Sequence, residues 1–330
     1  MLPHPAASVF GLALAWTLLF AGCTGNPRHQ PEAQANTPSP AMTRTPSIPA
    51  FSGQRAFEIL LKQTSFGPRN PNSKGHRDCL DYLATTLRDL APEIRLQEFT
   101  HTGYRGEKLR LTNIVASFGP DLQQRILLCA HWDTRPRADQ DPDPAKRDKP
   151  IPGANDGASG VAILLELARI LKEDAPNVGV DLVLFDGEDY GMEGDHASYL
   201  LGSRHFAATR APAYLPRFGI LLDMVGDAYL DLPREGYSVR YAPDIVDLVW
   251  NTARDLGIGQ FTADVGPEII DDHLPLNEAG IKTIDLIDFN YPDPSNSYWH
   301  THQDTPEHCS PQSLEAVGTV LTHVIYTQKP

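Results

Sequence analysis

Cysteine is scarce in this sequence. Its 330 residues include four cysteines, and none has the close spacing to a second cysteine that zinc-binding cysteine motifs show. Any metal must therefore be held by histidines and carboxylates. Cys129 lies in an apolar run that predicts a buried thiol, and the sequence leaves open whether Cys79 pairs with Cys309.

Positive charge is also in short supply. Lys and Arg total 28 against 42 Asp and Glu, which gives a net charge of −14. A surface of this charge repels phosphate backbones and anionic membranes, which argues against a nucleic-acid partner. The 41% of hydrophobic residues is enough for a sizeable globular core.

Two common hydrolase signatures are missing. The chain has no Gly-x-Ser-x-Gly segment, which argues against a serine hydrolase of the α/β type. It also has no His-Glu-x-x-His segment, which excludes the thermolysin-like zinc proteases.

The N-terminal segment is typical of an exported protein. Residues 9–21 are nearly all apolar, which suits a signal sequence and is too short to span a bilayer. Small residues precede Cys23, so we predict that residues 1–23 are a lipoprotein-type signal with lipid at Cys23; an ordinary cleaved signal is the alternative. Either form predicts export to the periplasm or cell envelope. Residues 24–50 are rich in Pro, Ser and Thr and predict a disordered linker, so that 51–330 form one catalytic domain.

Strand and helix patterns alternate along the folded part. This alternation predicts an α/β fold, a three-layer α/β/α sandwich with a mixed, mainly parallel central sheet. The predicted strands are continuous apolar runs or half-apolar segments at 109–118, 125–130, 180–185, 218–222 and 283–289. The predicted helices are at 73–90, 157–171, 245–256 and 311–327.

Acidic and imidazole side chains follow the predicted strands where each strand ends. Ligands of open α/β sheets bind outside the carboxyl ends of the strands, so these residues should meet at one edge. Clustered carboxylates are costly unless they are paired, protonated or bound to metal. They lie at His131, Asp133, Asp186, Glu188, Asp189, Asp223, Asp271, His273 and His300.

Seven short segments together resemble one family, the zinc metallopeptidases that include bacterial aminopeptidases and animal-type glutaminyl-peptide cyclotransferases (glutaminyl cyclases). Each is weak alone, but all seven occur in the family's order from about Phe51 onward. They are His131-Trp132-Asp133, Gly153-Ala154-Asn155-Asp156-Gly157, Phe185-Asp186-Gly187-Glu188-Asp189, Gly202-Ser203-Arg204-His205, Leu221-Leu222-Asp223-Met224, Asp271-Asp272-His273-Leu274-Pro275 and Trp299-His300-Thr301. The resemblance implies a zinc exopeptidase-like fold.

The resemblance also implies roles for particular residues. Asp156, Asp189 and His300 match the three ligands of a single Zn²⁺; Asp189 departs from the family, which commonly has Glu there. Glu188 matches the general acid/base. Further catalytic acids are Asp223 and Asp271, which should raise the pKa of Glu188, and Trp299 matches a wall of the substrate pocket. His131, with Asp223, matches a second metal position used by the aminopeptidases.

Three functions remain open on the sequence. The favoured one is cyclisation of N-terminal glutamine of peptides or proteins to pyroglutamate with release of ammonia, supported by the extra acid at Asp271 and by Trp299 before His300. The second is a two-zinc aminopeptidase. The third is a non-catalytic binding protein on the same fold. We expect a monomer that touches membrane only through a lipid at Cys23.

Overall fold

The computed structural model describes residues 15, 17–19, 22, 48–192 and 194–330. Contacts divide the chain into two units, Met1–Thr45 and Pro46–Pro330. Cys23, nearly all of the predicted signal sequence (1–23) and most of the predicted linker (24–50) lie outside the described residues. None of the helices in the described ranges is both long enough and apolar enough to cross a membrane.

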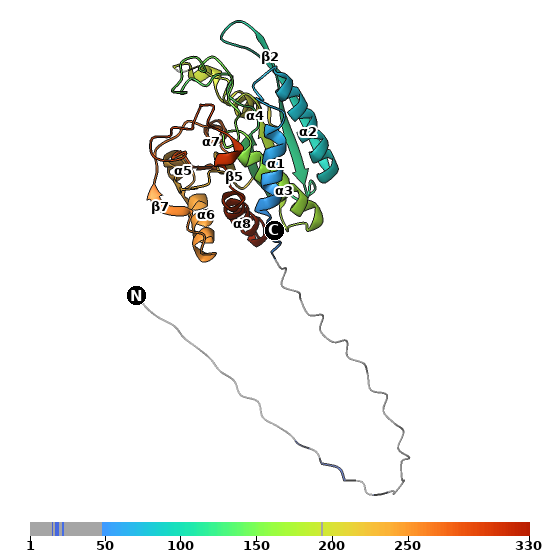
Figure 1. Ribbon diagram of the computed structural model, residues 1–330. Helices are drawn as coiled ribbons and strands as arrows, with labels where there is room; N and C mark the ends of the chain where they lie inside the picture. Colours follow the sequence, from blue (N-terminus) through green and yellow to red (C-terminus); the bar gives the residue numbers. More distant parts are fainter. Residues whose placement is uncertain (1–14, 16, 20–21, 23–47, 193) are drawn as a thin grey trace, which may run out of the picture. The chain divides into compact units, whose positions relative to one another are not determined.

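The second unit alternates helices and strands (Figure 1). The helices are α1 (Gly53–Thr64), α2 (Lys74–Leu90), α3 (Ser159–Glu173), α4 (Leu201–Thr209), α5 (Gly236–Tyr241), α6 (Pro243–Asp255), α7 (His273–Glu278) and α8 (Pro311–Thr327). The strands are β1 (Glu93–Thr102), β2 (Lys108–Phe118), β3 (Arg125–His131), β4 (Gly179–Phe185), β5 (Gly219–Asp223), β6 (Leu232–Arg234), β7 (Phe261–Val265) and β8 (Thr283–Ile287).

Six strands form the central sheet in the order β1-β2-β4-β3-β5-β8. The pairs β1–β2 and β2–β4 are antiparallel, whereas β4–β3, β3–β5 and β5–β8 are parallel. The predicted mixed, mainly parallel sheet is therefore confirmed. A second sheet of β6 and β7 was not predicted, since neither short strand has an apolar run.

The inner strands bury both faces because their side chains alternate between two cores. In β3, Ile126 and Leu128 belong to the large core under α1, α2, α3, α6 and α8, whereas Leu127 and Cys129 belong to the smaller core. Phe206 of α4 and Leu276 of α7 cover that second face. The helices therefore flank the sheet in two layers, and the predicted sandwich is confirmed (Figure 1).

The three described cysteines are separate buried thiols. Cys79, Cys129 and Cys309 are all free, so the pairing of Cys79 with Cys309 that the sequence left open does not occur. The predicted burial of Cys129 is confirmed, and burial holds the pKa of its thiol well above the usual value.

Candidate metal centre and pocket

The loop that carries Asp156 is fixed from two directions. The Asp304 carboxylate accepts hydrogen bonds from the backbone N–H of Asn155 (2.7 Å) and of Asp156 (3.2 Å). Gly157 has a φ of +93°, and a Cβ there would lie 2.2 Å from the carbonyl oxygen of Asp133, so only glycine fits. Asp156 thus sits before α3 rather than capping it, and its carboxylate is aimed at two histidines.

Asp156, Asp189 and His300 converge. Nε2 of His300 lies 3.6 Å from Oδ2 of Asp156 and 3.3 Å from Oδ1 of Asp189. One ligand atom from each residue lies within 4.8 Å of the others, and all three residues are buried. Oδ2 of Asp189 is buried without a hydrogen-bond partner, which is costly unless a cation lies beside it. Two oxygens and one nitrogen suit a zinc site with an open fourth position.

A second group of ligand atoms shares Asp156. Nε2 of His131 lies 3.1 Å from Oδ1 of Asp156 and 3.1 Å from Oδ1 of Asp223. The neighbouring acids raise the pKa of the buried His131 imidazole well above its usual value, although burial alone would lower it. The residues predicted for a second metal position therefore also meet.

Glu188 lies among several other acidic groups of the site. It is half-buried, and its backbone N–H donates to Oδ1 of Asp133 over 3.1 Å. Burial raises the pKa of Glu188 well above its usual range, and the charges of Asp189, Asp271 and Asp272 raise it further, although His131 opposes them. The predicted rise in the pKa of Glu188 is confirmed, and Asp271 is one of its causes. Asp223, the other predicted cause, is not among the principal ones.

A set of buried acids lies behind Glu188. Asp271 and Asp272 are buried at the start of α7, and Ser203 of α4 donates its hydroxyl to Asp272. Burial, with neighbouring carboxylates, raises the pKa of Asp272 to about 7 and that of Asp271 well above its usual range. Asp285 of β8 is a third such acid. The sequence pointed to Asp271 alone, because Asp285 lies inside an apolar strand.

A cavity of about 330 Å³ opens beside the ligand residues. His300 and Trp299 form one side, and their rings stack with centroids 3.7 Å apart. Tyr199 and Ile270 also line it, together with Asp139 of the long loop after β3. Trp299 thus lies in the pocket as predicted. Tyr199 supplies an aromatic wall, and its place in the pocket could not be predicted because it lies ten residues beyond Asp189.

Two other buried residues support the site in ways that the sequence did not predict. Arg135 donates from Nη1 to Oδ1 of Asp189 over 2.8 Å, yet nothing in the sequence marks it as more than a loop arginine. Asp304 supports the loop that carries Asp156 through the two backbone hydrogen bonds that its carboxylate accepts. His273 faces Glu235 (3.4 Å) and Asp285 (3.9 Å), not the ligand cluster, and it is the first residue of helix α7.

Fold and site together define a class. A three-layer α/β/α fold that gathers carboxylates and imidazoles at the carboxyl ends of parallel strands, beside an acid of raised pKa, defines a metal-dependent enzyme. The chain belongs to peptidase family M28, whose model matches residues 113–325.

Solved structures give closer comparisons. A glutaminyl cyclase from Tannerella forsythia is 43% identical, with a TM-score of 0.82 over 85% of this chain and 100% of that one. A structure described as a leucine aminopeptidase precursor, from Bacteroides thetaiotaomicron, is 42% identical, with a TM-score of 0.82 over 86% and 99%. Aminopeptidase YwaD of Bacillus subtilis is 26% identical over 83% of this chain, which spans only 57% of that protein.

Proposed function

We propose that this chain is a glutaminyl-peptide cyclotransferase that converts N-terminal glutamine of peptides or proteins to pyroglutamate and releases ammonia. The observation that carries the proposal is the convergence of Asp156, Asp189 and His300 next to Glu188 and a small aromatic pocket. Similarity to a solved glutaminyl cyclase at 43% identity over nearly the whole folded unit supports it.

One Zn²⁺ held by Asp156, Asp189 and His300 is part of the proposal. The buried, unpartnered Oδ2 of Asp189 and the mixed oxygen and nitrogen donors fit this ion. When bound, zinc supplies Lewis acidity that polarises the side-chain amide carbonyl of the substrate glutamine.

Glu188 moves the proton that the cyclisation requires. The neutral α-amine of the substrate attacks the side-chain amide carbon, and a carbon–nitrogen bond forms as the bond to the amide nitrogen breaks. Glu188 accepts the proton that the amine loses and returns it to the departing nitrogen, which leaves as ammonia. A carboxyl with a raised pKa suits both steps, since it exchanges protons near neutral pH.

The pocket suits a short, uncharged side chain. Trp299, Tyr199 and Ile270 offer apolar surface that can enclose the two methylene groups of glutamine. The pocket's volume of about 330 Å³ is small, and enclosure of this kind favours the folded-back conformation in which amine and amide meet.

A two-zinc aminopeptidase is the second candidate, because His131, Asp156 and Asp223 form a second group of ligand type. That enzyme would use two metals to activate water and bind the free amine. The 42% identity to a structure described as a leucine aminopeptidase precursor also supports an aminopeptidase function.

One experiment separates the two functions. The purified protein is incubated with a peptide that begins with Gln and, separately, with one that begins with Leu, and zinc is measured per chain. Ammonia from the first peptide with about one zinc supports the cyclotransferase, whereas free leucine with about two supports the aminopeptidase. Neither product from a zinc-loaded protein would favour a non-catalytic binding protein.

We also propose export to the cell envelope with a lipid on Cys23 and a monomeric state, supported by the apolar run at 9–21 and the small residues before Cys23. Metabolic labelling with a fatty acid tests the anchor. Label that persists in Cys23→Ser would refute it. Light scattering tests the monomer, and a dimer mass would refute that part.

A further inference from the structure

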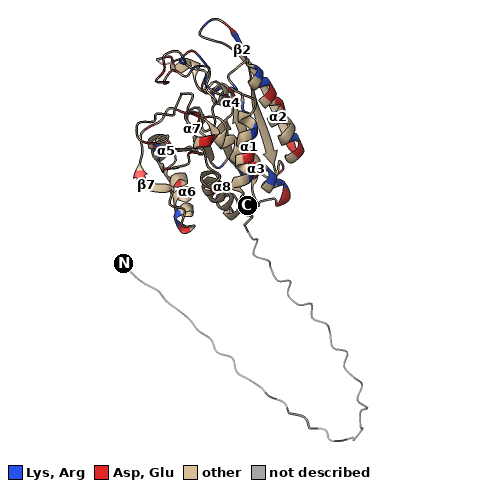
Figure 2. Ribbon diagram, viewed as in Figure 1, with Lys and Arg blue, Asp and Glu red and all other residues tan. Residues whose placement is uncertain are grey.

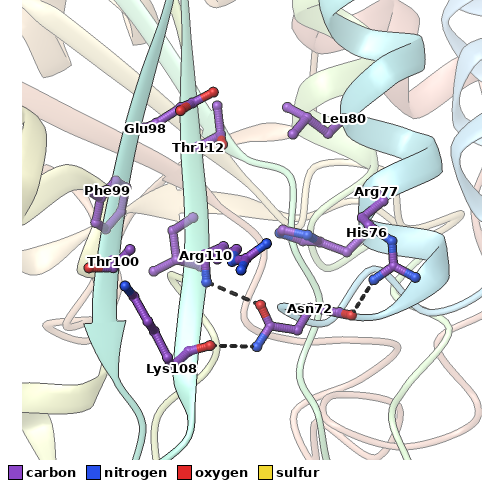
Figure 3. Close-up of a pocket in the computed structure, with 11 residues that line it drawn as sticks. Asn72, His76, Arg77, Leu80, Glu98, Phe99, Thr100, Lys108, Arg110 and Thr112 are labelled. Carbon is purple, nitrogen blue, oxygen red and sulfur yellow. Dashed lines mark hydrogen bonds between the residues drawn. The ribbon is translucent and has the colours of Figure 1, made fainter.

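A larger cavity lies away from the proposed zinc ligands, between α2 and the hairpin of β1 and β2. Its volume is about 840 Å³, and Figure 3 shows residues that line it. Arg77 of α2 and Lys108 and Arg110 of β2 line it, with His76 between them and Leu80 as apolar wall. None of these residues has a role in the proposed cyclisation.

The cavity exists because one face of the hairpin changes from apolar to polar. Ile94 and Leu96 of β1, with Ile114, Ala116 and Phe118 of β2, pack into the large core. The same face continues with Glu98 and Thr100, opposite Thr112 and Arg110 in the strand register. A sheet face turned toward a helix is normally apolar, so charged side chains in this position leave the helix and the sheet apart.

One side chain holds the two walls of the cavity together. It forms hydrogen bonds with the backbone of β2, as a neighbouring strand would. Asn72, with a φ of +68°, donates its amide to the carbonyl of Lys108 (3.0 Å) and accepts from the N–H of Arg110 (3.1 Å). Arg77 donates to the carbonyl of Asn72 over 2.6 Å (Figure 3). These bonds tie the start of α2 to β2, so the cavity is a built feature rather than a gap between mobile parts.

His76 reaches the cavity from a buried position. Its ring stacks on Trp132 with centroids 4.4 Å apart, and its Nε2 lies 2.9 Å from Oδ1 of the buried Asp186. Burial alone would lower the pKa of His76, but the Asp186 carboxylate outweighs it and raises that pKa. Nδ1, the other ring nitrogen, has no hydrogen-bond partner among the described residues, so it is free to contact a ligand.

Two of the cations in this cavity, Lys108 and Arg110, are not used by the protein itself. Among the described residues, the side chains of Lys108 and Arg110 have no hydrogen-bond or ion-pair partner. Lys and Arg mark the hairpin and the adjoining end of α2 in Figure 2. In a chain of net charge −14, three basic residues and one acid, Glu98, around one cavity form a local positive site.

We propose that this cavity binds a small organic anion, whose carboxylate or phosphate group lies among Lys108, Arg110 and His76. Arg and Lys are the usual partners of both groups, through charge-assisted hydrogen bonds. The volume of about 840 Å³ falls in the range of small-molecule sites, and Leu80 gives contact for the organic part.

Titration calorimetry on the zinc-loaded protein at low ionic strength tests this site with two probes. One is tricarballylate, a tricarboxylate without the hydroxyl with which citrate chelates metal; the other is inorganic phosphate. We expect one equivalent to bind, and the double variant Lys108→Glu/Arg110→Glu to weaken binding at least about tenfold. The matched control, Arg88→Glu/Lys329→Glu, reverses two exposed cations elsewhere and should bind like the wild type.

The two probes identify the group that the cavity takes, since binding of only one of them assigns a carboxylate or a phosphate. No binding of either probe at about 10 mM overturns the proposal. An equal loss of affinity in both double variants also overturns it, because that loss would be an effect of net charge. Undiminished binding to Lys108→Glu/Arg110→Glu overturns it too. Conversion of a Gln-peptide, measured alongside, shows that each variant is folded and keeps this result separate from the proposed activity.

Discussion

Arg135 is a buried residue that contacts one of the proposed zinc ligands directly. Its guanidinium is buried between Asp189 and Asp139 and also donates to the hydroxyl of Tyr199 over 2.9 Å. Asp189 is one methylene shorter than the glutamate common at this position in the family. Arg135 holds Oδ1 of Asp189, the oxygen that also lies 3.3 Å from Nε2 of His300, and so fixes how the shorter side chain presents itself to the ligand group.

We therefore predict that Arg135→Met weakens zinc binding about 10- to 100-fold, the usual cost of losing a partner that orients a metal ligand. Competition with a chelator measures this affinity without any assay of activity. Arg135→Lys keeps the positive charge but loses the planar guanidinium group with its fixed donors, so it should recover part of the zinc affinity. Wild-type zinc affinity in Arg135→Met would show that Asp189 needs no such support.

Glu188→Gln should remove cyclisation while leaving the metal in place. Gln is similar in size but cannot carry a proton, so the rate should fall about 100- to 10,000-fold. Zinc per chain should stay at the wild-type value, since Glu188 is not one of the grouped ligand residues. Ammonia release from a Gln-peptide gives the rate, and activity retained in this variant excludes the proposed proton transfer.

Some of the ligand-type residues, His131, Asp189 and Asp223, could be predicted because each lies at or within a few residues of a recognisable strand end, whereas Asp156 and His300 lie in loops farther along and were assigned from the resemblance. Asp189 and Asp223 follow or end buried apolar runs, so the topology alone brings them to one edge. Arg135 and Tyr199 carry no such mark. Their place depends on how two irregular loops fold over the site, and loop conformation follows from tertiary contacts that have no periodic pattern in sequence.

Among the elements, those with a strong apolar period were the predictable ones. The strand predicted at 180–185 is β4 and the helix predicted at 157–171 is α3, each within two residues at both ends. The edge strand β1 was missed, since most of its side chains are at least half-exposed and it lacks an apolar run. Helices α1, α4, α5 and α7 were also missed; α5 and α7 have six residues each, which give too little of a helical period.

The long loop after β3 is better anchored than its composition indicates. Residues 136–152 of this loop are rich in Asp and Pro. Asp139 and Gln140 line the pocket beside His300. Asp141 accepts hydrogen bonds from the backbone N–H of His302 (3.1 Å) and of Asp143 (2.9 Å), and lies 3.0 Å from Nδ1 of His302. The loop is thereby tied to the segment that carries His300.

Asp141→Asn should therefore lower stability in a pH-dependent way. Burial alone would raise the pKa of Asp141, but the hydrogen bonds from His302 and Asp143 lower it from 3.8 to about 2. A lowered folded-state pKa stabilises the fold above about pH 4, and this contribution is lost as the pH falls toward 2. We expect the variant to be about 1 kcal/mol less stable at pH 7, with the gap closing below pH 4.

Urea denaturation at several pH values measures that gap. Asp148→Asn is a suitable control, because Asp148 is exposed in the same loop. It should match the wild type throughout. A gap for Asp141→Asn that stays constant from pH 7 to pH 3 would contradict the assigned role of the carboxylate.

At the scale of the whole molecule, the sheet edge carries more negative charge than its own cations balance. Asp156, Asp189 and Asp271 are all buried there, and Arg135 and His131 are the basic groups that reach the ligand residues among the described residues. Like charges at this density oppose folding unless protons or a metal ion compensate them. A bound divalent cation should therefore stabilise the entire folded unit as well as the reaction.

Zinc should accordingly raise the melting temperature of the metal-stripped protein. A ligand that binds only the folded state at about 100 times its Kd adds about 2.7 kcal/mol, which corresponds to a rise of about 4–5 °C for a domain of this size. Activity should vanish on chelation and return with the metal. In His300→Asn the zinc-dependent rise should shrink, since one of the three grouped ligands is lost. Because the readout is the difference with and without zinc, a general loss of stability in that variant cancels. An equal rise in both proteins would place the stabilising ion elsewhere, and the site that Asp156, Asp189 and His300 form would then need another explanation.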